Sequence, residues 1–245
     1  MKNISKIKNL KTCFTLAEVL ITLGIIGVFA DMTMPNLLAN VNGNKYRSQL
    51  KKTVSTIIQA VRLNQANYDW TFADVSEQCG GTNFQSHTSD THMSICAILN
   101  SNLAGKQGIY RDRDLRQSLG YSFNGNAVGL SHADGQYTLY LLADGSIVGV
   151  RSISFQKSCS LAIGESLSEK LTSGDFHHCT GFIDVNGTSL PNQETMCSVG
   201  TTTKDINADC IVKSKDMKDV FPIVYHDAIV EPATNATRYV LQTTK

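Results

Sequence analysis

The sequence predicts an α+β fold in which one long N-terminal helix precedes a β-rich head with an antiparallel sheet and disulfides. Three observations lead to this prediction: an apolar run over residues 14–34, a helical stripe over residues 45–68, and short apolar runs between turn residues in the rest of the chain. The 245 residues then divide into a basic leader over residues 1–13, a long helix over residues 14–70 and a head over residues 71–245.

The start of the chain is typical of a membrane anchor. Residues 1–13 carry four lysines and no acidic residue, whereas the 21 residues from Phe14 to Met34 are apolar apart from three threonines, Glu18 and Asp31. A helix of that length reaches about 30 Å, the thickness of a bilayer core. Because a basic flank stays in the cytoplasm, we expect one membrane span with a cytoplasmic N-terminus and the head on the opposite side.

Four residues in and just after this run are candidates for contacts between helices. A lone carboxylate in hydrocarbon costs on the order of several kcal/mol, so Glu18 needs a partner there. Gly24 and Gly27 give one helix face that another helix can approach closely. Pro35 removes a backbone donor and bends the helix.

The second part of the helix is amphipathic. Its apolar residues recur at intervals of three, four or seven: Tyr46, Leu50, Val54, Ile57, Ile58, Val61 and Tyr68. Residues 40–44, with the sequence NVNGN, disfavour helix between the two parts. The basic residues fall mostly off the stripe. By charge they fit an acidic lipid or nucleic-acid surface, but a solvated face, or one that meets acidic neighbours, is the default interpretation. They lack aromatic interleaving of the kind that single-strand binders use.

The head is predicted to contain several strands and two short helices. The strongest signal is a hairpin over residues 136–153, turning at Asp144-Gly145. A weaker hairpin is predicted over residues 121–130. Further strands are predicted over residues 180–187, 219–230 and 238–242, the last closing the sheet, and helices over residues 94–104 and 166–173.

The cysteines predict disulfides in an oxidising compartment. Cys13 precedes the apolar run, and six cysteines without a CxxC pair follow it: Cys79, Cys96, Cys159, Cys179, Cys197 and Cys210. Six cysteines allow fifteen pairings. Pairing of sequence neighbours is the working hypothesis, and buried free thiols are the alternative.

No cofactor is expected, and calcium is the one exception considered. The loop DVNGTSLPNQE offers the oxygen ligands Asp184, Asn186, Asn192 and Glu194. The EF-hand pattern fails there, because Ser189 stands at the sixth position, where glycine is needed, and Thr195 at the twelfth. A simple turn is therefore the default interpretation.

Other chemical signals are weak. His87, Asp90 and His92 do not have the spacing of a zinc site, and His178 beside Cys179 does not fit a nucleophile with its base. Residues 186–188 and 235–237 match the glycosylation pattern Asn-x-Thr. No phosphate loop, dinucleotide fingerprint or GxSxG is present, so the sequence supports no enzymatic activity.

Three kinds of N-terminal signal compete. A cleaved secretory signal needs a small-x-small site after the apolar run, and GVFADM is a poor match. A lipoprotein signal needs its apolar segment before the cysteine, whereas Cys13 precedes that segment. The third kind is a short basic leader that is removed before the apolar run.

A signal of this third kind is seen in a known family of proteins, and the N-terminal segment resembles it. The segment KTCFTLAEVLITLGIIGVFADMTMP, residues 11–35, resembles the class III signal of type IV pilins and type II secretion pseudopilins. In this resemblance Phe14 is the first mature residue, Glu18 the fifth and Pro35 the twenty-second, where such pilins often carry proline. It covers about residues 6–68, and the head agrees only in plan. One departure is Cys13, since glycine or alanine usually precedes the cut.

The resemblance implies assembly and not catalysis. A prepilin peptidase would cut between Cys13 and Phe14 and methylate the new amine, more slowly because of Cys13. The expected partners are copies of the chain, other pilin-like subunits, the inner-membrane assembly platform and membrane lipid. Glu18 of one copy would pair with the Phe14 amine of the next. The head would lie in the periplasm or outside the cell.

The sequence is compatible with more than one function. The rival function is a single-pass anchored binding or enzymatic head that never polymerises. Secretion pseudopilins, major or minor pilins and DNA-uptake pilins are not separated by the sequence. The stretch from residue 69 onwards has 13 basic and 19 acidic residues, a net charge of −6, so no nucleic-acid partner of the head is expected.

Overall fold

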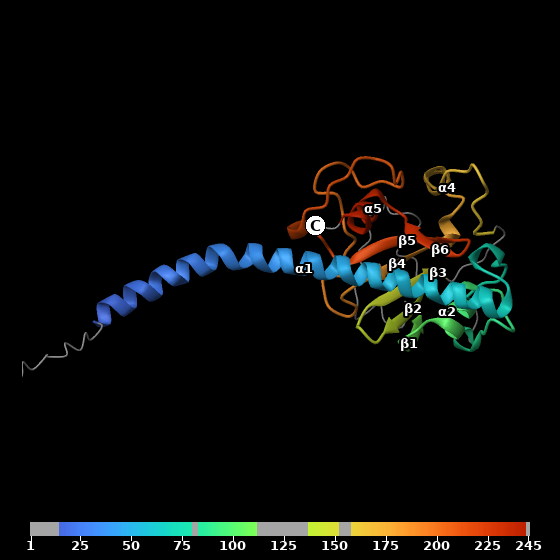
Figure 1. Ribbon diagram of the computed structural model, residues 1–245, viewed down its shortest axis with the longest axis horizontal. Coiled ribbons are helices and arrows are strands. Elements are labelled where there is room, and N and C mark those ends of the chain that lie inside the picture. Colours follow the sequence, from blue (N-terminus) through green and yellow to red (C-terminus); the bar gives the residue numbers. More distant parts are fainter. Residues whose placement is uncertain (1–14, 80–82, 112–136, 152–157, 244–245) are drawn as a thin grey trace, which may run out of the picture. The chain divides into compact units, whose positions relative to one another are not determined.

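The computed structural model describes residues 15–79, 83–111, 137–151 and 158–243 (Figure 1). Among them, the α-helices are α1 Leu16–Tyr68, α2 Ile95–Asn102, α4 Leu167–Ser173 and α5 Asn235–Gln242. Short 3-10 helices lie at Phe72–Asp74, Phe84–Ser86, His177–Cys179 and Ser214–Asp216. The strands are β1 Lys106–Arg111, β2 Tyr137–Leu142, β3 Ile147–Arg151, β4 Thr180–Asp184, β5 Val220–His226 and β6 Ile229–Pro232. Contacts within the chain form two units, Met1–Val41 and Asn42–Lys245, whose boundary falls inside α1.

The strands form one six-stranded antiparallel sheet in chain order, from β1 to β6. The central hairpin predicted from the sequence is confirmed, since β2 and β3 pair in register around Asp144 and Gly145. Gly145 has a φ of 86°, which favours glycine, and the Asp144 carboxylate accepts the Ser146 N–H at 3.1 Å. Together with α1 and the disulfides, the sheet gives the α+β layout that the sequence predicts.

The second half of α1 lies across one face of this sheet (Figure 1). Leu50, Ile57 and Val61 are at most 1% exposed and belong to one cluster with apolar residues of β2 to β5. The predicted stripe is therefore correct up to Val61, whereas Tyr68 at the helix end is 40% exposed. The opposite face of the sheet carries a smaller apolar cluster around Phe182.

The helix also continues through residues 40–44, where the sequence disfavours it. The reason for a glycine there is packing, because Gly43 is buried against the segment before β5. A Cβ added to Gly43 would lie only 2.8 Å from the Cβ of Ser214. The segment around Ser214 therefore approaches the helix more closely than any other residue type at position 43 permits.

Two further sequence predictions need correction or completion. The strand predicted over residues 238–242 is wrong, because these residues belong to α5. Thr234 caps that helix by accepting the Thr237 N–H, and Ala236 and Val240, four residues apart, are fully buried. Strand β6 closes the sheet instead. Strand β1 was not predicted, and the hairpin predicted over residues 121–130 lies outside the described residues.

Three disulfides tie the head together. They join Cys79 to Cys96, Cys159 to Cys179, and Cys197 to Cys210, closing stretches of 17, 20 and 13 residues. This is the nearest-neighbour arrangement among the fifteen possible ones.

Candidate assembly site

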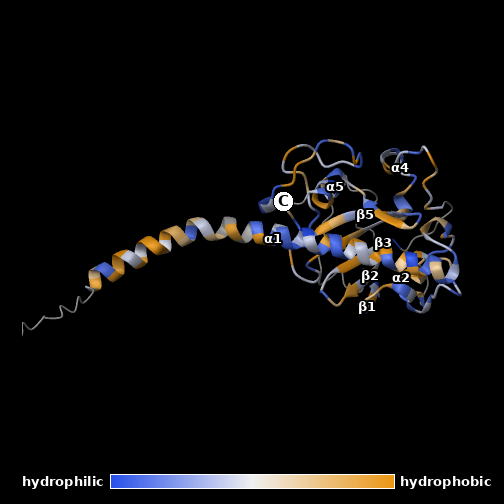
Figure 2. Cartoon of the chain, in the orientation of Figure 1, coloured by the Kyte–Doolittle hydropathy of each residue, from blue (hydrophilic) through white to orange (hydrophobic). Residues whose placement is uncertain are grey.

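The first part of α1 is an exposed apolar helix. The 19 residues Leu16–Met34 have a mean hydropathy of 1.8, and none of this stretch is buried within the chain. Figure 2 shows apolar residues along this part of the helix, and large side chains such as Leu16 (80%) and Phe29 (65%) are mostly exposed. The helix is therefore long and apolar enough to cross a membrane once.

Glu18 caps the start of this helix within its own chain. Its Oε2 accepts hydrogen bonds from the backbone N–H and from the hydroxyl of Thr15, both at 2.8 Å. In return, the Glu18 N–H donates to Thr15 Oγ1 at 3.3 Å. This reciprocal pair is a capping box, with Thr15 at the N-cap and Glu18 as the third helical residue. The carboxylate thus satisfies donors that would find no water in hydrocarbon.

The capping role is one that the sequence analysis missed. Thr15 and Glu18 have the Ser/Thr-x-x-Glu spacing that marks a helix start before an apolar run, so the signal was present. A carboxylate offers about four acceptor positions, so a cap within the chain leaves room for the predicted pairing between copies. The two roles differ in what they require: the cap needs acceptor oxygens, and the pairing needs a negative charge.

The other predicted assembly residues lie in the same helix or outside the described residues. At Gly24 and Gly27 an added Cβ would meet no atom within 4 Å, so the helix surface is open at both positions. Pro35 lies inside α1, which continues through it. Cys13 and Phe14, the predicted cleavage and methylation residues, lie outside the described part of the chain.

The carboxylates of the proposed calcium loop are separated by a strand. Asp184 is fully buried at the end of β4, where its Oδ1 accepts the N–H groups of Asn186 at 3.1 Å and Gly187 at 2.9 Å. Val220 at the start of β5 pairs with Asp184 and also forms a bridge to Glu194. Asp184 and Glu194 therefore lie on opposite sides of β5.

Asn192, another of the four calcium candidates, makes a structural contact. Asn192 is buried, and its N–H donates to Oδ2 of Asp219 at 2.9 Å. Within the described ranges, the single group of three His, Cys, Asp or Glu ligand atoms closer than 4.8 Å is Cys159, His178 and Cys179. Two of these three residues form a disulfide. The calcium site at residues 184–194 stays a prediction.

The histidine pair of the predicted polar loop comes together without forming a metal site. The rings of His87 and His92 stack with their centroids 3.8 Å apart, at 16°, and His92 Nδ1 lies 2.7 Å from Oε2 of Glu77. Burial and the neighbouring His92 lower the pKa of His87. Because the lone pairs of an imidazole lie in its ring plane, two nearly parallel rings are poorly placed to bind one ion together.

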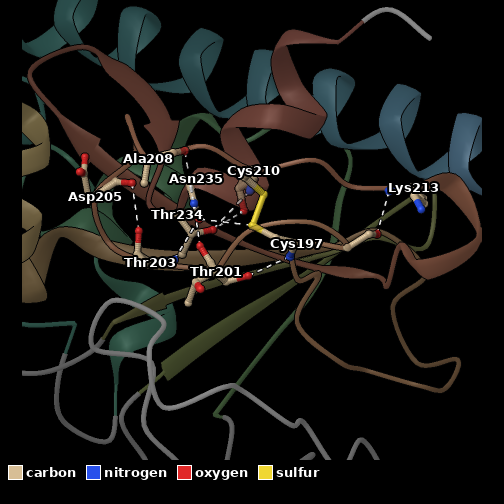
Figure 3. Close-up of a disulfide and its surroundings, with 12 residues drawn as sticks. Cys197, Thr201, Thr203, Asp205, Ala208, Cys210, Lys213, Thr234 and Asn235 are labelled. Carbon is tan, nitrogen blue, oxygen red and sulfur yellow. Dashed lines mark hydrogen bonds between the residues drawn. A yellow bond between two sulfur atoms is a disulfide. The ribbon is translucent and has the colours of Figure 1, made fainter.

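Asn235, the first residue of α5, holds the loop closed by the Cys197–Cys210 disulfide (Figure 3). Its Nδ2 donates to the Thr201 carbonyl at 2.9 Å, and its Oδ1 accepts the Thr203 N–H at 2.9 Å. Asn235 is fully buried, so the glycosylation pattern at residues 235–237 presents no accessible amide in the folded head.

We expect Asn235→Ala to lower the free energy of unfolding by about 2–3 kcal/mol, because it leaves backbone groups of the loop without partners. The measurement is denaturant unfolding of the full-length chain in detergent. Asn207→Ala is the matched control, since Asn207 lies exposed in the same loop. Equal stability of the two variants would contradict the role given to Asn235.

His226 joins two carboxylates in the β5–β6 hairpin. It is 2% exposed, with Nδ1 2.7 Å from Asp227 Oδ2 and Nε2 2.9 Å from Glu231 Oε2. Burial lowers the pKa of His226, but hydrogen bonds to Glu231 and Asp227 outweigh burial and raise it. The Asp227 N–H also donates to the carbonyl of Cys159 at 2.9 Å, so the hairpin turn contacts the second disulfide.

The contribution of His226 to stability should depend on pH. A raised folded-state pKa gives a stabilisation that is complete below the unfolded-state pKa, about 6.5, and is lost as rising pH deprotonates the folded protein. The difference in unfolding free energy between the wild type and His226→Gln should therefore shrink as the pH rises above about 6.5. A difference that stays constant from acid to alkaline pH would rule out a protonated bridge.

Comparison with known proteins gives no match: no family model, no curated protein and no solved structure is significantly similar to the chain. The likeness of residues 11–35 to a processing signal therefore rests on those residues alone. A functional proposal has to be built from the exposed apolar helix, its capped carboxylate and the disulfide-bonded head.

Proposed function

We propose that the chain is a pilin-like subunit that is cleaved after Cys13, methylated on Phe14 and assembled into a pilus or pseudopilus filament. The observation that carries the proposal is the exposed apolar helix Leu16–Met34. This helix directly follows a basic leader and has a carboxylate in its first turn. The filament would serve type II secretion or a type IV pilus function.

An exposed apolar helix of this kind needs two coverings in succession. Before assembly, membrane lipid covers it, and the single-pass anchor then keeps the head outside the cytoplasm. After assembly, the helices of neighbouring copies cover it, with Gly24 and Gly27 giving open positions for close approach. Three disulfides fit a head in an oxidising compartment such as the periplasm.

Glu18 supplies the specific contact in this proposal. Cleavage exposes an amine at Phe14 in a region of low dielectric, and an offset neighbouring copy brings its own Glu18 beside that amine. Opposite charges attract more strongly in such a region than in water, so this pair would favour contact between copies. The capping box lies within one chain and is the same before and after assembly, so it adds nothing to the contact between copies.

The capping box favours one alternative. If Glu18 serves only to cap α1, the carboxylate already has its role within one chain and no second copy is required. The protein would then be a single-pass anchored binding or enzymatic head that does not polymerise.

The two functions are separated by expressing the chain with a prepilin peptidase and a filament assembly system. The pilin-like proposal predicts that shearing releases the processed chain with filaments, and that omission of the peptidase abolishes this release. Retention of the whole chain in the membrane fraction, with the peptidase active on a control pilin, would favour the anchored head.

A further inference from the structure

A basic surface, here called the basic patch, brings together two parts of the sequence that are far apart. It comprises the α1 residues Lys45, Arg47 and Lys51 and, from the segment before β5, Lys213 and Lys215. Gly43 packs against Ser214, which brings the second segment onto the helix. Residues 43, 47 and 51 are spaced by four and share one helix face, whereas Lys45, two residues after Gly43, lies on the other side of the helix. All four lysines are exposed.

The charge of the basic patch is not neutralised by the protein. In the part of the chain that the structure describes, none of its five members forms an ion pair. Lys51 donates to the carbonyl of Thr243, which carries no charge. Among the acids of this region, Asp216 is exposed, whereas Asp184 and Asp219 are buried and accept backbone N–H groups. The basic patch is therefore open to an external anion.

Arg47 indicates what kind of anion fits. Its side chain is only 6% exposed, and its Nε and Nη1 are buried without any hydrogen-bond partner. A buried guanidinium without partners is costly, and its forked donors match two oxygens of one phosphate. The exposed lysines of the basic patch would attract a phosphate to this surface, and a movement of the buried Arg47 side chain would let its two donors meet the phosphate oxygens.

The position of the basic patch in the chain places such phosphates within reach. Large exposed apolar side chains continue past the span to Leu37 (64%) and Val41 (56%), and Lys45 follows four residues later. Four residues extend over at most about 14 Å, whatever the conformation between them. A lysine side chain and a screening length of about 8 Å extend the electrostatic reach further.

We propose that the basic patch binds anionic phospholipid headgroups at the membrane surface, with Arg47 donating to a lipid phosphate. This proposal rests on the membrane anchor of the proposed function but not on polymerisation. Its consequence is that the head is held against the bilayer before assembly, and that leaving the membrane requires this contact to be broken.

The test uses the full-length chain in lipid nanodiscs, one copy per disc, made of phosphatidylcholine alone or mixed equally with phosphatidylglycerol. Amide hydrogen exchange of residues 42–52 and 211–218 reports the contact. Phosphatidylglycerol should slow this exchange, and high salt should restore it. Each lysine near an anionic surface strengthens binding about fivefold, so Lys213→Gln with Lys215→Gln should weaken the contact about 25-fold.

The matched control is Lys170→Gln with Lys204→Gln, which removes two positive charges from another part of the head. Lys170 lies in α4, and Lys204 lies near it, because Ser168 of α4 forms a hydrogen bond with Asp205. The control pair should keep the full lipid effect. Arg47→Gln, like the Lys213→Gln/Lys215→Gln variant, should lose the lipid effect. If Arg47→Gln does not fold, the Lys213→Gln/Lys215→Gln variant alone tests the proposal.

Several outcomes would overturn the proposal. Two of them are an amide exchange rate that is the same in both lipids, and a control pair that loses the lipid effect as fully as the Lys213/Lys215 variant does. The other two are slowed exchange when inorganic phosphate is added to phosphatidylcholine discs, and slowed exchange that depends on the number of copies per disc instead of on the lipid. The last two would assign the basic patch to a free anion or to a second copy of the chain. A chain that never inserts into the discs would contradict both the basic patch proposal and the membrane anchor. Amide exchange that does not depend on the lipid, in a chain that does insert, would contradict the basic patch proposal alone.

Discussion

Glu18→Ala is expected to leave membrane insertion of the chain unchanged and to abolish or sharply reduce its incorporation into filaments. Insertion depends on the apolar length of Leu16–Met34, which the substitution does not shorten. Assembly, in contrast, would lose the negative charge that we propose to pair with the Phe14 amine of the next copy. The two effects are measured in the same cells, as the membrane-bound fraction and as the sheared filament fraction.

Glu18→Ala alone does not separate the charge from the cap, because it removes both. Glu18→Gln does, since glutamine also accepts the Thr15 N–H in a capping box but carries no charge. If the charge pair drives assembly, the glutamine variant fails as the alanine variant does. Normal filaments from Glu18→Gln, with none from Glu18→Ala, would show that the cap is the role of Glu18. Normal filaments from both would remove Glu18 from assembly altogether.

The second large effect is expected from the Cys159–Cys179 disulfide. Replacing both cysteines with alanine should lower the free energy of unfolding of the head by about 3 kcal/mol, because the unfolded chain regains the freedom of a loop of 20 residues. Both cysteines are buried, at 1% and 0% exposure, so lost packing adds to this cost. Denaturant unfolding of the full-length chain in detergent measures it.

The Cys197–Cys210 disulfide provides the internal comparison. Its cysteines are 13 positions apart in the sequence, so its loop has a similar length. Both cysteines are partly exposed, however, and Asn235 continues to hold the loop when the bond is removed. Its double alanine variant should therefore lose less stability than the Cys159–Cys179 variant. The opposite order would mean that burial and the Asp227 contact do not set the cost.

The elements that the sequence predicted correctly are those with strong local signals. The β2–β3 hairpin has an Asp-Gly turn between alternating apolar residues, and the stripe through Leu50, Ile57 and Val61 repeats at helical spacing. The errors occur where tertiary contacts override local preference. Gly43 disfavours helix in isolation, but its close contact with Ser214 makes it the residue that fits. Residues 238–242 have the apolar content of a strand, but the Thr234 cap starts a helix there.

The candidate site was predicted unevenly for similar reasons. The apolar helix and its carboxylate follow from composition. The capping box was not predicted, although the Thr-x-x-Glu spacing of Thr15 and Glu18 contains its signal. The basic patch could not be predicted, since the packing of Ser214 against Gly43 is what brings the distant segment with Lys213 and Lys215 onto the helix. The disulfide pairing was one arrangement among many, because cysteine spacing alone does not determine connectivity.

The mass of the N-terminal peptide of the mature protein, isolated from cells that contain a prepilin peptidase, tests the central proposal most directly. The account predicts a peptide that begins at Phe14, lacks residues 1–13 and carries one methyl group on its amine. The mature chain then retains the six cysteines of the three disulfides. An intact N-terminus, or lipid attached to Cys13, would contradict the account.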